Sequence, residues 1–158
     1  MKGYSRRFAY AALVYLGLAA ACEGLGYLTD LGPAAGFAHL HFNLLGFISM
    51  AAYSLAYFAL PSFAGRALRY PHWIPWHFWL ANVSLISMVT WRGLELSYGS
   101  VAYTWSFAVS AAVQVATVGL FVVHVWLTLT RPGRAQSNAL VPRPSQAPAE
   151  RTKERPTD

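Results

Sequence analysis

The sequence predicts an all-α integral membrane protein, a four-helix bundle with both termini in the cytoplasm. Of its 158 residues 56% are hydrophobic and only 11% are charged, whereas a soluble domain carries about 25% charged residues. The apolar residues form four runs of membrane-spanning length, and the basic residues gather outside them. This pattern excludes a soluble enzyme and a nucleic-acid module, so the net charge of +6 reflects topology and we expect no nucleic-acid partner. The single cysteine, Cys22, excludes a disulfide framework within one chain.

The four runs cover residues 8–28, 36–60, 73–94 and 101–130. We expect each to be a helix, because an open strand cannot satisfy its backbone in lipid. The first run is too long, and too closely followed by further spans, to be a cleaved signal peptide. Residues 1–131 are therefore predicted to form one transmembrane domain in contact with the lipid bilayer.

Orientation follows from the basic residues of the short loops, which are more frequent on the cytoplasmic side. The loop at 29–33 carries only Asp30. The opposite ends of the helices carry Lys2, Arg6, Arg7, Arg66, Arg69, Arg131 and Arg134. We therefore expect a multi-pass protein of the cell inner membrane. Residues 132–158 are rich in Pro, Ala and charge without periodicity, and are predicted to be a disordered cytoplasmic tail.

Polar residues inside the runs recur at helical spacing, which indicates the faces that point into the bundle. The first run offers mainly the small residues Gly17, Ala21 and Gly24, with Glu23 as its only charge. Arg92 and Glu95, near the outer end of the third run, are close enough to pair across one turn. The predicted inward stripes are His39, Asn43, Gly46, Met50, Tyr53 and Tyr57; His77, Ala81, Ser84, Met88, Trp91 and Glu95; and Tyr103, Ser106, Ser110, Gln114, Thr117, Phe121, His124 and Thr128.

Histidine is the residue type that points to a function. Imidazole is a common ligand of haem iron and copper. His39 and His41 lie near the predicted outer end, His77 and His124 near the inner end, and His72 lies in a loop where we expect only hydrogen bonding. On a helix His39 and His41 are about 200° apart, so they cannot chelate one ion. His39 belongs to the inward stripe, whereas His41 shares a lipid-facing side with Leu45, Ile48, Ala52 and Leu55 and needs a haem or another chain to cover it.

The segment from Ala38 to Phe47 (AHLHFNLLGF), followed by Tyr53, Tyr57 and Leu60-Pro61, and the helix start His77-Phe78-Trp79-Leu80-Ala81-Asn82 resemble the catalytic subunit (subunit I) of haem-copper oxidases. The similarity is greatest to the nitric oxide reductase and cbb3-type branch. It covers about residues 36–95, so the chain would correspond to the last four helices of a twelve-helix subunit.

The resemblance implies that His39 binds a high-spin haem and His41 a low-spin haem. Asn43 and Gly46 belong to the same motif and are expected to contribute to a haem b site, where Gly46 leaves room for a porphyrin edge. Arg92, at the predicted outer face, is a candidate for the same site because its position would suit a haem propionate. The helices that carry the copper ligands and the other low-spin haem ligand have no counterpart in this chain. We therefore do not expect an autonomous oxygen or nitric oxide reductase.

Three hypotheses follow from these observations. The first is a b-type haem protein that uses His39, His41 or both, in electron transfer or diatomic gas binding, alone as a homo-oligomer or with a larger oxidase or reductase subunit. The second is a cofactor-free accessory or assembly subunit of such a respiratory complex. The third is a cytochrome with haem between His77 and His124, although adjacent helices about 8–10 Å apart leave little room for it.

Overall fold

The computed structural model describes residues 2–65 and 67–130, and every regular element in this part of the chain is helical. The order is α1 (Lys2–Leu28), α2 (Gly32–His41), a π-helical segment η1 (Phe42–Ile48), α3 (Ser49–Phe63), α4 (Trp73–Tyr98) and α5 (Val101–Leu129). The all-α prediction is confirmed for the described residues. The predicted disordered tail, 132–158, lies outside them.

Three continuous helices are long and apolar enough to cross a membrane: Gly3–Leu28, Gly32–Phe63 and Val101–Leu129. The helix α4 has 26 residues, so its length would also suffice. Its mean hydropathy is lower than that of the other three because it contains His77, Asn82 and several tryptophans. The predicted membrane character is thus supported by three of the four helices.

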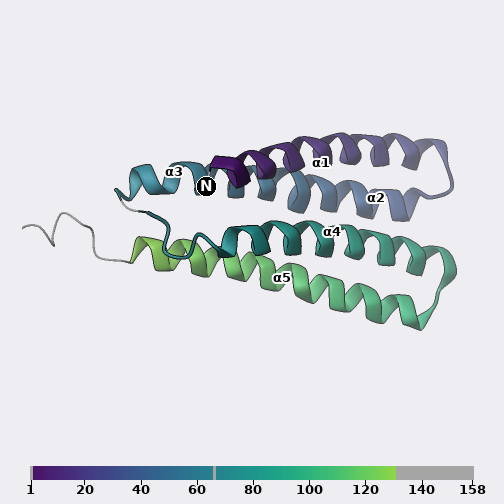
Figure 1. The fold of residues 1–158 in the computed structure, drawn as a ribbon. Helices are drawn as coiled ribbons and strands as arrows, with labels where there is room; N and C mark the ends of the chain where they lie inside the picture. Colours follow the sequence, from purple (N-terminus) through teal and green to yellow (C-terminus); the bar gives the residue numbers. More distant parts are fainter. Residues whose placement is uncertain (1, 66, 131–158) are drawn as a thin grey trace, which may run out of the picture.

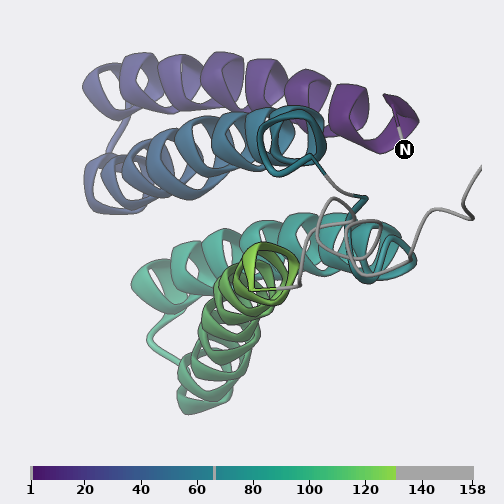
Figure 2. The ribbon, with the colours of Figure 1, turned by 90° about the vertical axis from the view of Figure 1, so that its left-hand side faces the viewer.

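The helices form two antiparallel hairpins that pack on each other (Figure 1). One pairs α1 with the continuous helix α2–η1–α3, and the other pairs α4 with α5. Figure 2 shows the two hairpins as separate layers. The first turn lies at Thr29–Leu31, where Pro33 at the start of α2 suits a first helical turn. The second turn lies at Gly99, which ends α4 with a positive φ of 65°.

The face of α1 that packs inward differs from the predicted one. Gly17, Ala21 and Gly24 are exposed, and a Cβ on Gly17 or Gly24 would meet nothing within 4 Å. The buried side chains follow the same helical spacing on another face, and are Ser5, Phe8, Ala12, Tyr15 and Ala19. The prediction was wrong because it assumed that small residues would line the contact between closely packed helices. Aromatic side chains of α1, such as Phe8, fill the space between the hairpins instead.

The π-helical segment η1 shifts the inward face of the second span. Gly46, Met50, Tyr53 and Tyr57 are buried as predicted. Before them a wider turn adds one residue per turn, so the inward positions become Phe42 and Ala38 instead of Asn43 and His39. Asn43 and His39 are half-buried. The predicted stripe is therefore correct after the π-helix and displaced by one residue before it.

The stripes of α4 and α5 are confirmed where they meet. The buried residues include His77, Ala81, Ser84 and Met88 on α4, and Ser110, Gln114, Thr117, His124 and Thr128 on α5. Ser84 Oγ donates a hydrogen bond to Gln114 Oε1 across the interface at 2.5 Å. Most of the remaining hydroxyls donate to the carbonyl four residues earlier, which satisfies them without water.

The loop between the hairpins is fixed at two points. Leu68 is buried in the core, and the backbone N–H of Arg69 donates to Thr128 Oγ1 at 3.3 Å. This loop lies at the same end of the molecule as the start of α1 and the end of α5 (Figure 1). The two turns at Thr29–Leu31 and Gly99 lie at the other end, which we call the turn end.

Candidate functional site

His39 lies near the turn end, on the side of α2 that packs against α1. Its Nδ1 donates a hydrogen bond to the carbonyl oxygen of Ala19 at 2.9 Å, and Glu23 Oε2 lies 3.7 Å from the same nitrogen. Since a carbonyl can only accept, the proton is on Nδ1 and the lone pair of the neutral ring is on Nε2. The imidazole is oriented by its neighbour while its second nitrogen stays available.

His41 has the same arrangement of hydrogen bonds on a different side of the helix. Its Nδ1 donates to the carbonyl oxygen of Phe37 at 2.8 Å, and its ring stacks on the Phe37 ring with centroids 3.8 Å apart. The predicted divergence of the two histidines is thus observed. His41 is half-buried rather than lipid-facing, because the π-helix turns it away from Leu45, Ile48, Ala52 and Leu55 and Phe37 covers it.

Arg92 lies over the rings of Phe37 and Phe107. Its guanidinium carbon is 5.9 Å from the centroid of Phe37 and 5.5 Å from that of Phe107. Nη1 donates to Glu95 Oε2 at 2.6 Å, which confirms the predicted pairing across one turn. The Thr104 hydroxyl donates to the other carboxylate oxygen, Oε1, at 2.8 Å. The structure therefore places both Arg92 and His41 against the ring of Phe37.

Gly46 lies farther from the turn end, where α1 and η1 approach most closely. A Cβ on Gly46 would lie 2.5 Å from both Cβ and Cγ of Tyr15. The Tyr15 hydroxyl in turn donates to Asn82 Oδ1 at 2.9 Å, which links α1 to α4. Gly46 thus contacts a helix neighbour, while Asn43 is half-buried one turn away.

His77 and His124 are buried together toward the opposite end, at 0% and 1% exposure. Tyr57 lies beside both, with its ring centroid 5.8 Å from that of His77 and 5.7 Å from that of His124. The Tyr57 hydroxyl and His77 Nδ1 are hydrogen-bonded at 2.9 Å, with the donor set by the histidine tautomer. Neither His77 Nε2 nor the nitrogens of His124 have a partner among the described residues. Phe8 and Phe121 pack on His77, so aromatic rings occupy the space around it.

Sequence reasoning missed several of these partners. Glu23 and His39 lie at equal separation from Leu31, at the turn of the first hairpin, and Ser84 and Gln114 lie at equal separation from Gly99. In an antiparallel hairpin, residues at equal sequence separation from the turn lie at the same height on the two helices. Counting outward from each turn could therefore have predicted both pairs. Helical spacing could have found the contact of Phe37 with His41, four residues later on the same helix. No such signal marks the contacts of Phe37 with Phe107 or of Tyr57 with His77, which depend on how the two hairpins pack.

No family model, no curated protein and no solved structure matches this chain. Among residues 2–65 and 67–130, no group of three His, Cys, Asp or Glu side chains is placed to hold a metal ion. The similarity to the haem-copper oxidases therefore stays a prediction.

Proposed function

We propose that the protein is a membrane b-type haem protein, similar to the last helices of a haem-copper oxidase or nitric oxide reductase catalytic subunit, and that it holds haem through His39, His41 or both. The observation that carries the proposal is the shared geometry of the two rings. Each donates its Nδ1–H to a backbone carbonyl, as metal-ligating histidines usually do, so Nε2 is oriented as a ligand. Two imidazoles are too few for an ion held by protein alone, but one or two suffice for haem iron.

The surroundings of His39 fit a flat ligand. A groove of about 290 Å³ lies beside it between α1 and α2, lined by Cys22, Glu23, Tyr27 and three glycines, Gly26, Gly32 and Gly36. A Cβ on Gly36 would meet nothing within 4 Å, so the wall of the groove is open at that glycine. Glycines leave space for the edge of a macrocycle beside the imidazole of His39.

Different residues of the chain would have different roles in haem binding. His39 and His41 would hold the iron through Nε2, the carbonyl oxygens of Ala19 and Phe37 would keep the two rings in the required tautomer, and Arg92 would offer a cation to a carboxylate at the turn end. When bound, haem b would supply one-electron redox chemistry or a site for a diatomic gas. Among the described residues no further histidine lies beside either ring, so any additional ligand would come from another copy of the chain or from a larger oxidase or reductase subunit.

The absorption spectrum of the purified protein tests this function. We expect a Soret band in the wild type and its loss in the double variant His39→Ala/His41→Ala. The single variants identify the ligand, and His124→Ala, a buried histidine at the other end, is the matched control that should keep the band. A band shift with carbon monoxide would indicate an open axial position.

The cofactor-free hypothesis gives the opposite result. It is favoured by the fact that both histidines already have intrahelical or interhelical partners, which a purely structural role would also produce. If haem supplied during expression gives no Soret band, or if the double variant binds as much haem as the wild type, the protein is better described as an accessory or assembly subunit. Loss of the band only in His77→Ala and His124→Ala would support the third hypothesis instead.

We propose in addition that all four helices cross the cell inner membrane as a bundle, with both termini cytoplasmic. The support is the position of Arg6, Arg7 and Arg69 at the end away from the two turns, together with the hairpin arrangement. Protease added to inside-out vesicles should remove the residues after about Arg131 and leave the spectrum unchanged. Cleavage of the tail only in right-side-out vesicles would reverse the topology.

A further inference from the structure

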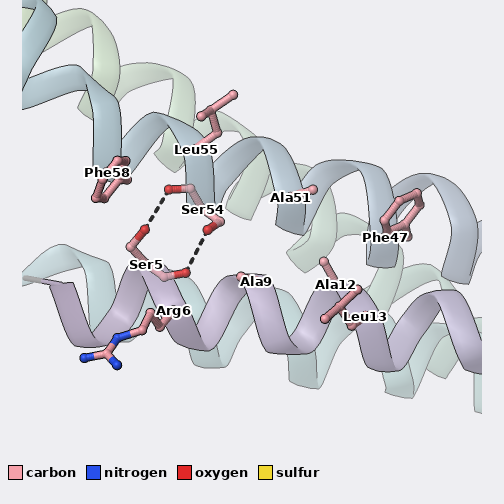
Figure 3. Close-up of a pocket in the computed structure, with 10 residues that line it drawn as sticks. All are labelled: Ser5, Arg6, Ala9, Ala12, Leu13, Phe47, Ala51, Ser54, Leu55 and Phe58. Carbon is pink, nitrogen blue, oxygen red and sulfur yellow. Dashed lines mark hydrogen bonds between the residues drawn. The ribbon is translucent and has the colours of Figure 1, made fainter.

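A groove lies between α1 on one side and η1 and α3 on the other, and it begins near the start of α1, at Ser5 and Arg6 (Figure 3). Its volume is about 470 Å³. Small side chains, Ala9, Ala12 and Ala51, leave the space, and Phe47 and Phe58 lie at its two ends. Both helices belong to the segments that are long and apolar enough to cross a membrane, so the groove would be immersed in lipid.

Apart from Arg6 at one end, the side chains that line the groove carry no free polar group. Ser5 and Ser54 line it, but each hydroxyl donates to the backbone carbonyl of the other residue, both at 2.8 Å (Figure 3). Their donors are therefore already used within the protein. The occupant of the groove should accordingly be an apolar chain rather than a polar molecule.

Arg6 is the one charged residue among those that line the groove, and it lies at the end marked by Phe58. It is exposed and lies in the first turns of α1, where an aqueous boundary and lipid headgroups are expected. From Arg6 the groove extends along α1 to Leu13, about 10 Å at 1.5 Å per residue. A cation at the headgroup level beside an apolar groove is complementary to an anionic phospholipid.

We propose that this groove binds one acyl chain of an anionic phospholipid, with the phosphate at Arg6. A second copy of the chain fits the same surface less well. A two-fold axis along the membrane normal would bring two Arg6 side chains to the same height near the contact, and like charges there repel. The proposal is independent of haem binding and of which side of the membrane the termini occupy.

Native mass spectrometry of the full chain tests whether the charge of Arg6 determines which lipid is bound. The detergent-purified protein is stripped of lipid and offered phosphatidylglycerol or phosphatidylcholine with the same acyl chains. We expect the wild type to prefer phosphatidylglycerol about fivefold, the factor that corresponds to one basic residue at an anionic surface. Arg6→Gln should remove this preference. Arg7→Gln is the matched control, because it makes the same charge change but its guanidinium lies over the Tyr4 ring, 4.7 Å from the centroid.

A second pair of variants tests the groove itself. Ala9→Leu fills it and should reduce retention of both lipids, whereas Ala20→Leu, exposed on the same helix, should not. Equal binding of the two lipids, equal loss in Arg6→Gln and Arg7→Gln, or unchanged retention in Ala9→Leu would overturn the proposal. A lipid-free dimer that disappears in Ala9→Leu would show that a second copy occupies the groove.

Discussion

The contact between Gly46 and Tyr15 gives the most direct test of the packing. In Gly46→Ala the added Cβ would lie 2.5 Å from Cβ and Cγ of Tyr15, a separation that real Cβ atoms essentially never show. These are the inner atoms of the tyrosine, so rotation of its ring cannot relieve the clash. The backbone of α1 or η1 must move instead, and the Tyr15 hydroxyl then moves away from Asn82 Oδ1, now 2.9 Å away.

Three effects determine the change in the free energy of unfolding. Overpacking of a fitted core costs about 1–3 kcal/mol, and loss of a hydrogen bond between helices costs about 1 kcal/mol. The better helix propensity of alanine returns about 1 kcal/mol. We therefore expect Gly46→Ala to destabilise the protein by about 1–3 kcal/mol.

Reversible unfolding in mixed micelles measures this difference. Gly17→Ala is the matched control, because its Cβ would meet nothing within 4 Å, and it should be neutral or slightly stabilising. The difference in the free energy of unfolding should be larger between Gly46→Leu and Ala52→Leu, because a leucine side chain is larger and Ala52 is exposed. If Gly46→Ala and Gly17→Ala agree within about 0.5 kcal/mol, a range typical of surface changes, the helices do not approach as described.

Two further predictions concern buried polar groups and pH. Tyr57→Phe removes the hydrogen bond to buried His77 and should cost about 1–3 kcal/mol; the double variant Tyr57→Phe/His77→Phe should recover part of this loss in a double-mutant cycle, and a strictly additive result would argue against the pair. Glu95 lies beyond the predicted span 73–94, and hydrogen bonds from Arg92 and then Thr104 lower its pKa. Its contribution to stability should therefore be complete above the usual glutamate pKa of about 4.3 and be lost as the pH falls through the lower value of the folded state. Glu95→Gln should show a flatter decline of stability with acid, and an unchanged decline would count against this role.

Much of the site could be located from the sequence, but not its surroundings. Periodicity identified the inward faces of α4 and α5, because both helices are regular and amphipathic along their length. It also gave the opposed directions of His39 and His41, which follow from helical rotation alone. It did not give the partner of His39, since Ala19 is contributed by another helix. The contact of His41 with Phe37, by contrast, is a spacing of four residues within α2 and could have been predicted.

The helices of the structure extend beyond the predicted spans in four places: α1 begins at Lys2, α2 begins at Gly32, α3 ends at Phe63 and α4 ends at Tyr98. Apolar runs report where a chain can cross lipid, whereas helices continue past the lipid until a glycine or a turn ends them. The pairing of Arg92 with Glu95 was predictable because it lies within one helix. The contacts of Glu95 with Thr104 and of Arg92 with Phe37 were not predictable, because they join different helices.

The sequence by itself determined the helical class, the approximate positions of the helices and the inward faces of α4 and α5, because these depend on composition and on a fixed rotation per residue. Only the tertiary structure decided which face of α1 is buried, how the π-helix rotates the histidine segment, and where the groove between α1 and α3 lies. The physical reason is that apolar side chains are favourable in lipid on every face of a spanning helix. Hydrophobicity therefore cannot distinguish inside from outside, and the shape complementarity of contacts such as Tyr15 against Gly46 makes that choice.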